Sequence, residues 1–229
     1  FSDNLKEVVK YSREEARLRA EAKGCSPYDA LLDIFEPGMT SAQLDVLFAD
    51  VKSWLPDLLN KVVAKQSQQS LIAPVGPFPT AVQRELGLET MAQLGFDFTA
   101  GRLDISAHPF CGGVPEDVRI TTRYDENELL SALFGVIHET GHARYEQNLP
   151  RSWSGQPIAL ARSTAIHESQ SLFFEMQLGR SKAFLMRLIP TVTRHFGDQA
   201  AFEESNFIAW NQQVKPGFIR VDADEVSYP

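Results

Sequence analysis

The sequence predicts a mainly α protein with one small β region beside a pair of helix-borne histidines. Two observations predict this class: apolar residues recur at helical spacing along most of the chain, and strand-like alternation is confined to residues 96–124. The chain has 229 residues, enough for a sizeable core. We expect a single domain in three stretches, helical over 1–95, β over 96–124 and helical again over 125–229.

Helix boundary signals are clear in the first stretch. The first helix should begin at Ser2 and stop at Gly24, because glycine readily adopts the left-handed conformation that ends helices. Ser26 is a suitable N-cap for the next helix, and the segment "TSAQ" (40–43) fits a capping box that opens a third. A further helix is predicted over 80–94.

The β stretch contains two runs with strand character. "RLDISA" (102–107) alternates, and "DVRITTRY" (117–124) is rich in β-branched residues. We expect these runs to pair as a hairpin, with "HPFCGGVPE" (108–116) as the loop between them. The chain should then return to helix, over about 126–148, 158–179 and 181–196.

Composition excludes some classes of function. A net charge of −8 argues against a nucleic-acid-binding protein, which needs a basic face. No apolar run approaches the roughly 20 residues of a membrane-spanning helix, so no membrane association is expected. The start has neither a basic region nor an apolar run, so no signal peptide is expected, and the two isolated cysteines, Cys25 and Cys111, are typical of reduced thiols in a cytoplasmic protein.

The segment "HETGH" (138–142) is a candidate metal-binding and catalytic motif. Two histidines four residues apart lie on one face of a helix, where both imidazoles can reach one ion. Glu139 lies one residue further round and can act as a general base on a water without ligating the metal. The alternative is that His138 and His142 are core residues whose ring nitrogens form hydrogen bonds within the protein and bind no metal.

A catalytic metal needs a third protein ligand. The following helix offers Glu168, and the loop between the two helices would bring them together antiparallel. His167 is a rival ligand, but it neighbours Glu168 around the helix and both cannot easily face the ion. On spacing alone, Glu168 could equally be an ordinary surface charge.

Several segments together resemble the M32 family of metallocarboxypeptidases, the thermostable carboxypeptidase Taq type. The order and approximate spacing of five motifs agree with that family. They are "HPF" (108–110), "DVRITT" (117–122), "HETGH" (138–142), "HESQS" (167–171) and "IRVDAD" (219–224).

The resemblance implies a helical, zincin-like body with a small sheet beside a deep groove. It implies one divalent ion per chain, zinc as first choice and cobalt as second, bound by His138, His142 and Glu168, with Glu139 as the base. A metal-activated water would hydrolyse the C-terminal peptide bond of peptides with broad specificity. The full-length protein would be a homodimer.

A carboxypeptidase must also recognise a free α-carboxylate, which a guanidinium group binds bidentately. The resemblance nominates Arg220 and Arg119, and the alternative for each is a structural salt bridge with a nearby aspartate. His108, in the predicted loop, is a candidate donor to the scissile carbonyl, or else a residue that fixes its loop by hydrogen bonds.

The resemblance also implies a partial chain, truncated at both ends, because family members are about twice as long. Two other functions remain open. One is a zinc oligopeptidase or endopeptidase with the same metal ligands, and the other is a non-catalytic helical fragment with an incomplete site.

Overall fold

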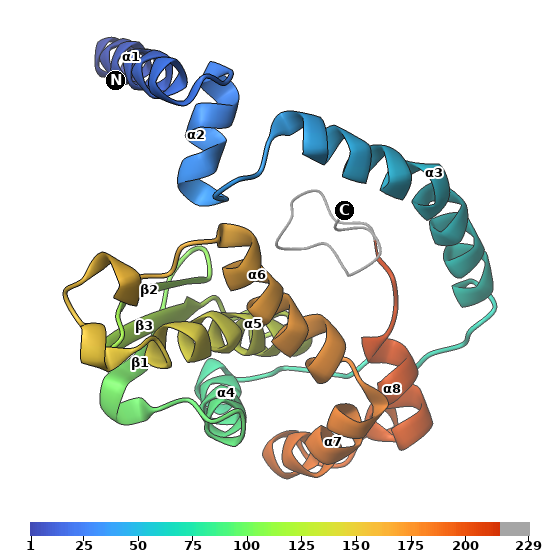
Figure 1. Cartoon of the computed structure of the whole chain (residues 1–229). Helices are drawn as coiled ribbons and strands as arrows, with labels where there is room; N and C mark the ends of the chain where they lie inside the picture. Colours follow the sequence, from blue (N-terminus) through green and yellow to red (C-terminus); the bar gives the residue numbers. More distant parts are fainter. Residues whose placement is uncertain (216–229) are drawn as a thin grey trace. The chain divides into compact units, whose positions relative to one another are not determined.

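The computed structural model describes residues 1–215. They are mainly helical with one small sheet, which confirms the predicted fold class (Figure 1). Contacts divide the chain into two compact units, Phe1–Leu58 with Arg162–Ala165, and Leu59–Ala161 with the chain from Ile166 onward. This division differs from the three predicted stretches, and a single domain stays a prediction.

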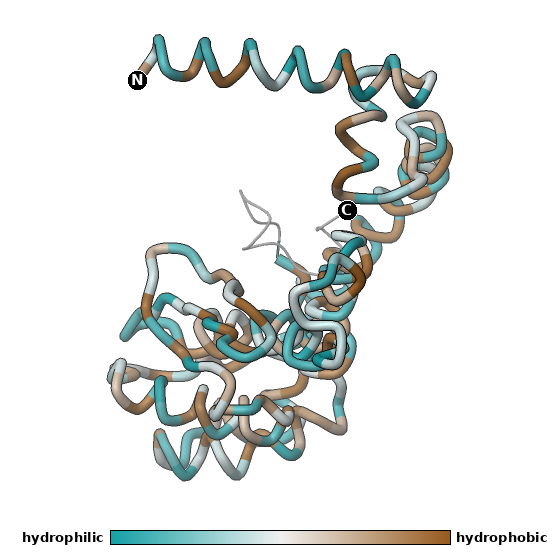
Figure 2. Tube along the Cα trace, turned by 60° about the vertical axis from the view of Figure 1, so that its left-hand side comes forward, coloured by the Kyte–Doolittle hydropathy of each residue, from teal (hydrophilic) through white to brown (hydrophobic). Residues whose placement is uncertain are grey.

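The first unit is built from helices whose ends follow their local sequence signals. It contains α1 (Ser2–Lys23), α2 (Pro27–Phe35) and most of α3 (Ser41–Gln66). Hydrophilic and hydrophobic residues alternate along α1 in Figure 2, and this helix ends where Gly24 adopts a left-handed φ of 69°.

Two predicted caps are confirmed. The Ser26 side chain accepts a hydrogen bond from the backbone N–H of Asp29 at the start of α2. At α3, the N–H of Gln43 donates to Thr40 Oγ1 at 3.3 Å, and the N–H of Thr40 donates to Gln43 Oε1 at 2.9 Å. This reciprocal pair is a capping box.

The sheet of the second unit has the strand order β1-β3-β2, with β1 (Gly101–Ile105), β2 (Phe110–Val114) and β3 (Asp117–Thr122). β1 pairs with β3 in parallel, and β2 pairs with β3 antiparallel. The predicted hairpin between the first and last runs is therefore wrong. The true hairpin joins β3 to a strand inside the segment that was predicted to be a loop.

The error has a physical cause. Leu103, Val118 and Ile120 are all buried on one face, so their alternation indicates which side faces the core but not in which direction the strands run. β2 has low strand propensity, because Gly112 and Gly113 occupy its middle. Gly113 also has a φ of +117°, which side chains rarely adopt.

The remaining helices belong to the second unit, except that the first two residues of α6 are grouped with the first. They are α4 (Thr80–Gln93), α5 (Leu130–Gln147), α6 (Thr164–Leu172), α7 (Lys182–Phe196), α8 (Glu204–Asn211), the π-helix η4 (Phe173–Gly179), and the 3-10 turns η1 (Phe98–Ala100), η2 (Arg151–Trp153), η3 (Pro157–Ala159) and η5 (Ala200–Phe202). α5 starts later than predicted because an isolated bridge joins Asp125 to Glu128. The helix predicted over 158–179 starts at Thr164 and changes to π-helical geometry at Phe173.

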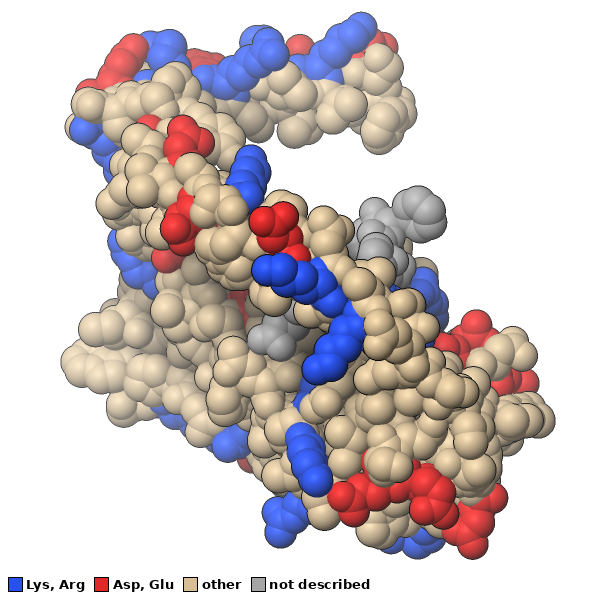
Figure 3. Space-filling view, turned by 90° about the vertical axis from the view of Figure 1, so that its right-hand side faces the viewer, with Lys and Arg blue, Asp and Glu red and all other residues tan. Residues whose placement is uncertain are grey.

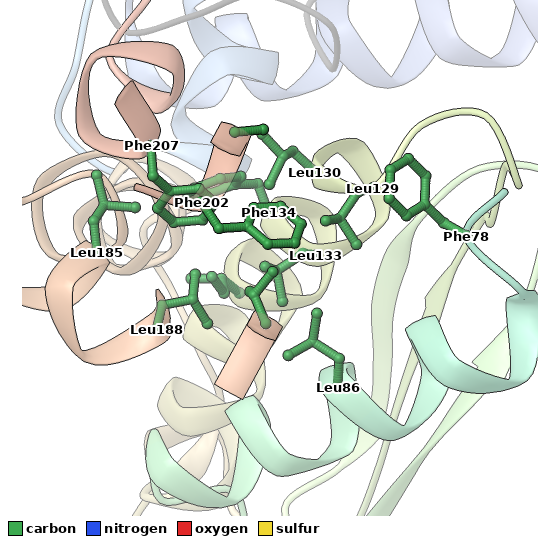
Figure 4. Packing of buried hydrophobic residues seen from close by; sticks show 13 residues of the cluster. Phe78, Leu86, Leu129, Leu130, Leu133, Phe134, Leu185, Leu188, Phe202 and Phe207 are labelled. Carbon is green, nitrogen blue, oxygen red and sulfur yellow. The ribbon is translucent and has the colours of Figure 1, made fainter. Parts of the chain in front are cut away.

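α5 lies beside the sheet and α4 (Figure 1), and it also contacts η4. Residues of α5 belong to two hydrophobic clusters. One of its faces packs Leu133 and Phe134 against Leu185 and Leu188 of α7, as Figure 4 shows. Another packs Val136 and Ala143 into a second cluster with residues of the sheet. Two buried faces hold this helix in place, and its remaining surface is available for polar groups.

The surface carries charges of both signs. On the face shown in Figure 3, lysine and arginine side chains and aspartate and glutamate side chains all reach the surface, with uncharged stretches between them. Within residues 1–215, none of the helices combines the length and the apolar character needed to cross a bilayer.

Gly141 sets the distance between α5 and α6. A Cβ at this position would lie 2.6 Å from Ser171 Cα and 3.0 Å from the carbonyl oxygen of Gln170. The same contact includes a hydrogen bond, in which Gln170 Nε2 donates to the Gly141 carbonyl at 3.1 Å. The two helices approach this closely because residue 141 has no side chain.

We predict that Gly141→Ala destabilises the protein although alanine favours helix. The added methyl must push α6 away, and overpacking of this kind costs about 1–3 kcal/mol. Gly135→Ala is a matched control on the same helix, because its Cβ would meet its neighbours at 3.7 and 3.8 Å, which is ordinary contact. Urea unfolding should show Gly135→Ala at least as stable as the wild type, and equal stability of the two variants would contradict the steric argument.

Both cysteines are free, with Cys25 exposed and Cys111 on β2 partly buried. Burial, together with the nearby charges of Glu139 and Glu146, raises the pKa of the Cys111 thiol to about 12. Only the thiolate reacts with disulfide reagents, so Cys111 is expected to stay unmodified at pH 8 while Cys25 reacts. A chromogenic thiol assay should count one fast thiol in the folded protein and two after denaturation. Loss of the fast phase in Cys25→Ser identifies it, and rapid modification of Cys111 would contradict the prediction.

Candidate metal centre

The partly buried side of α5 that faces away from the two clusters presents two imidazoles one helical turn apart. The ring centroids of His138 and His142 are 5.0 Å apart, and their side chains are 20% and 16% exposed. Their positions follow from the helix, since residues i and i+4 share a face. Because the other faces of α5 are buried in the two clusters, the histidine pair is directed toward Glu168 of α6.

α6 supplies a carboxylate to the same point. Glu168 Oε2 lies 3.2 Å from His142 Nε2 and 3.9 Å from His138 Nε2. The three ligand atoms all lie within 4.8 Å of one another. Around a tetrahedral zinc ion with bonds of about 2.0–2.2 Å, ligand atoms are about 3.3–3.6 Å apart. The three groups therefore fit one divalent ion with small adjustments, and the nitrogens that face it are both Nε2.

A second carboxylate holds the first histidine from behind. His138 Nδ1 lies 2.9 Å from Glu175 Oε2, and Arg180 Nη2 lies 3.7 Å from the other oxygen of that carboxylate. Arg180 is held in turn by a 2.7 Å hydrogen bond to the Asn211 carbonyl and by the Phe134 ring, 4.2 Å away. A histidine that ligates a metal commonly donates its other N–H to such a carboxylate.

Sequence reasoning missed Glu175. A signal was present, since Glu175 follows Glu168 by two turns and both would lie on one face of a continuous helix. The π-helical geometry of η4 contributes to placing the later carboxylate behind His138. π-helical turns are often found at functional sites.

The second ligand histidine, His142, is supported by His167 and Glu146 on the side away from the ligand atoms. His142 Nδ1 is 2.6 Å from His167 Nδ1, and His167 Nε2 is 2.7 Å from Glu146 Oε1. Both ring nitrogens of His167 thus have partners within the protein, and this residue does not face the point where the three ligand atoms meet. Glu146 was also missed, although its spacing of four residues from His142 puts both on one helical face.

Glu139 is buried, with 6% of its surface exposed. Its Oε2 has no hydrogen-bond partner among residues 1–215. Burial raises the pKa of this carboxyl to about 7, with His138 opposing the rise and Glu168 and Glu175 adding to it. A buried carboxylate oxygen without a partner is costly, and at a metal site it marks a group that can hold and release a proton.

The two histidines have opposite pKa shifts. Burial lowers the pKa of His142, so that its neutral form is favoured, as a metal ligand requires. Burial also acts against the charged form of His138, but the hydrogen bond and charge of Glu175 outweigh it and raise the pKa of this residue. The negative charge gathered around His138 is suited to a cation.

The structure does not bring Arg119 to this centre. Its guanidinium forms a bidentate ion pair with Asp117 of the same strand, with contacts of 2.7 and 3.1 Å. Arg119 alternates with Val118 and Ile120, which pack toward α5, so its side chain lies on the opposite, exposed face of the sheet. This is the salt bridge that the sequence left open as an alternative.

The other two predicted substrate-binding residues differ in their placement. His108 is exposed, and its carbonyl accepts a hydrogen bond from Thr121 Oγ1 at 3.2 Å. The adjacent Pro109 lies against Gly135, one turn before His138, so this loop borders the start of the metal centre. Arg220 and the segment 219–224 lie outside the described residues.

A family model and two curated relatives match this chain. The family model of carboxypeptidase Taq (M32) metallopeptidases matches residues 1–229. The chain is 43% identical to "Carboxypeptidase 1" of Bacillus subtilis (strain 168) and 40% identical to "Thermostable carboxypeptidase 1" of Thermus thermophilus. In both cases all of this chain aligns with 46% of the relative.

A solved structure gives the same result. "Trypanosoma Cruzi Metallocarboxypeptidase 1" matches 98% of this chain and 46% of its own, with a TM-score of 0.91 and 54% sequence identity. The chain thus spans about half the length of the relatives it matches. Together with a His-His-Glu group of suitable geometry, the family implies a divalent metal ion. The chain belongs to the M32 family of metallopeptidases, whose model covers it from end to end.

Proposed function

We propose that the protein containing this chain is a metal-dependent carboxypeptidase, and that His138, His142 and Glu168 hold its metal ion. One observation carries the proposal: three ligand atoms meet within 4.8 Å beside a buried glutamate, Glu139, whose oxygen has no partner among the described residues. The names of the relatives agree with the activity.

We propose one ion per chain, with zinc as first choice and cobalt as second. Both suit a set of imidazole and carboxylate ligands, and three protein ligands leave a tetrahedral position open. When bound, the ion would polarise the scissile carbonyl and lower the pKa of a water molecule. The acidic surroundings, with Glu139, Glu168 and Glu175 close to His138, support the binding of a cation.

Glu139 is the residue that we propose to move the proton. It is next to His138 in the chain, so it stands beside the ligands without being one of them. Its carboxylate would take a proton from the attacking water and give it to the leaving amine. Burial, which raises the pKa of this carboxyl, makes it a better proton acceptor than an exposed glutamate.

The proposed substrate is a peptide with a free C-terminus, cleaved one residue at a time with broad side-chain specificity. Arg220 is the candidate for binding the terminal carboxylate, and the ion pair with Asp117 makes Arg119 the weaker one. We assign His108 to the scissile carbonyl, because its loop borders α5 near Gly135.

For the complete protein we further propose a homodimer in the cytoplasm that does not bind nucleic acid or membranes. The family resemblance supports the dimer, the two free cysteines support a reducing compartment, and the net charge of −8 disfavours nucleic acid.

Glu139→Gln is expected to keep the metal and lose the activity. The amide cannot take a proton, and loss of a general base typically lowers kcat by about 10²–10⁴-fold. Metal content by atomic absorption and peptide hydrolysis should be measured on the same preparation of the complete protein. Glu14→Gln, at an exposed position on α1, is the control and should match the wild type. More than a tenth of wild-type kcat in Glu139→Gln would contradict the assignment.

A peptide pair distinguishes a carboxypeptidase from an endopeptidase with the same ligands. A peptide with a free C-terminus should lose single residues, while its C-terminal amide should react at least about 30-fold more slowly, because the guanidinium of Arg220 loses its charged partner. Arg220→Ala should raise KM for the free acid and leave the amide unaffected. Equal cleavage of both peptides, at an internal bond, would support the oligopeptidase instead.

A further inference from the structure

We propose that His167 and Glu146 form a positioning pair that fixes the ring of His142 for metal binding. The proposal rests on the metal site proposed above and concerns a residue that is not itself a ligand. His167 precedes the carboxylate ligand in α6, and its side chain lies behind the ring of His142. We assign His167 to bind the ring nitrogen of His142 that faces away from the metal.

If His142 binds the metal, each hydrogen bond from His142 to His167 and from His167 to Glu146 can have only one donor. His142 presents Nε2 to Glu168 at 3.2 Å, and a nitrogen that binds a metal must carry a lone pair. The proton of neutral His142 must then be on Nδ1, which lies 2.6 Å from His167 Nδ1. His167 Nδ1 is therefore the acceptor, and this selects the His167 tautomer with its proton on Nε2.

Glu146 completes the chain of hydrogen bonds. His167 Nε2 lies 2.7 Å from Glu146 Oε1, and a carboxylate can only accept. Each step therefore has one donor and one acceptor, and the chain ends on a carboxylate oxygen. Reversing it would place a proton on His142 Nε2, where it would block the ligand lone pair. The arrangement thus favours the tautomer of His142 that can bind a metal.

Packing holds the intermediate ring as well. The His167 ring lies 4.6 Å from the Tyr145 ring and 4.7 Å from the His142 ring, centroid to centroid, with tilts of 34° and 40°. Its side chain is 19% exposed. The contact with His142 is the edge-to-edge hydrogen bond, and the Tyr145 ring packs against His167 as a separate contact. A ring held by hydrogen bonds at both nitrogens and by this packing has few rotamers available, so it fixes the orientation of the His142 ring as well as its tautomer.

The two ligand histidines are supported differently. His138 donates directly to the carboxylate of Glu175, whereas His142 reaches Glu146 through the intermediate imidazole. His142 and Glu146 lie on the same helix, four residues apart, and His167 of α6 bridges them. The bridge therefore also joins the two helices that supply the ligands.

The test compares substitutions that differ in the acceptor they leave for His142. His167→Ala removes it, and loss of such a supporting group typically weakens metal binding by about 10–100-fold. His167→Asn keeps an acceptor, because the asparagine oxygen occupies nearly the position of the histidine Nδ1, and is expected to recover most of the affinity. Ser169→Ala, an exposed position on α6, is the control.

A second pair of variants tests Glu146, the last acceptor in this series of hydrogen bonds. Glu146→Gln keeps an acceptor for His167 Nε2 and should bind Zn²⁺ nearly as the wild type does. Glu146→Leu removes the acceptor and should weaken binding in the same way as His167→Ala. This pair decides the question if His167→Ala does not fold.

Zn²⁺ affinity is measured in the complete protein by competition with a chromogenic chelator, and Co²⁺ absorption spectra report the ligand geometry. Melting of the metal-free proteins separates positioning from folding. The proposal requires weaker binding and an altered Co²⁺ spectrum in His167→Ala, with recovery in His167→Asn. Unchanged affinity in His167→Ala, or no recovery in His167→Asn, would overturn it.

These readouts separate the inference from the proposed function. A wild-type protein that binds Zn²⁺ but releases no amino acids would refute the carboxypeptidase activity, while the affinities would still decide the role of His167. A wild-type protein that binds no Zn²⁺ would overturn both.

Discussion

The close contact between α5 and α6 at Gly141 is the constraint on which the metal centre depends. Two ligands come from α5 and one from α6, so the spacing of these helices decides whether three atoms can meet around one ion. Any side chain at position 141 would collide with the backbone of Ser171 and Gln170. Gly141 thus has a steric role, which is to let the two helices approach, and this role is as specific as the chemical roles of His138, Glu139 and His142.

The centre gathers more charge than a protein interior normally holds. Four glutamates, at positions 139, 146, 168 and 175, surround three imidazoles within a partly buried region. Glu146 and Glu175 are paired with histidine nitrogens, whereas Glu139 keeps an oxygen without a partner among the described residues. Burying such a group costs free energy, so its presence is better explained by function than by stability.

Rigidity comes from the elements around α5. Hydrophobic clusters cover two of its faces. Glu175, which holds His138, is contacted by Arg180, and His167, which holds His142, is contacted by the ring of Tyr145. Ligand positions within a few tenths of an ångström require this kind of support. The chain spans about half the length of its relatives, so the substrate-binding part of the proposed function depends partly on residues outside those described.

Local patterns determined much of this protein. The helix caps at Ser26 and Thr40, the fold class, and the shared helical face of His138 and His142 were predictable, because capping and helical periodicity act over a few residues. Spacing left Glu168 open as a surface charge, and only the family resemblance nominated it as the third ligand. The pairing of Arg119 with Asp117 was among the alternatives, and strand alternation placed it on the face away from α5.

Tertiary structure decided what depends on contacts distant in sequence. The direction of β1 against β3 was mispredicted because alternation indicates a buried face and is the same for parallel and antiparallel neighbours. Glu175 and Glu146 became part of the site only when the two helices packed together, and His167 changed from a rival ligand to a partner of His142. Periodicity places a side chain on a face of its helix, but which atom it meets depends on how closely the next helix can approach.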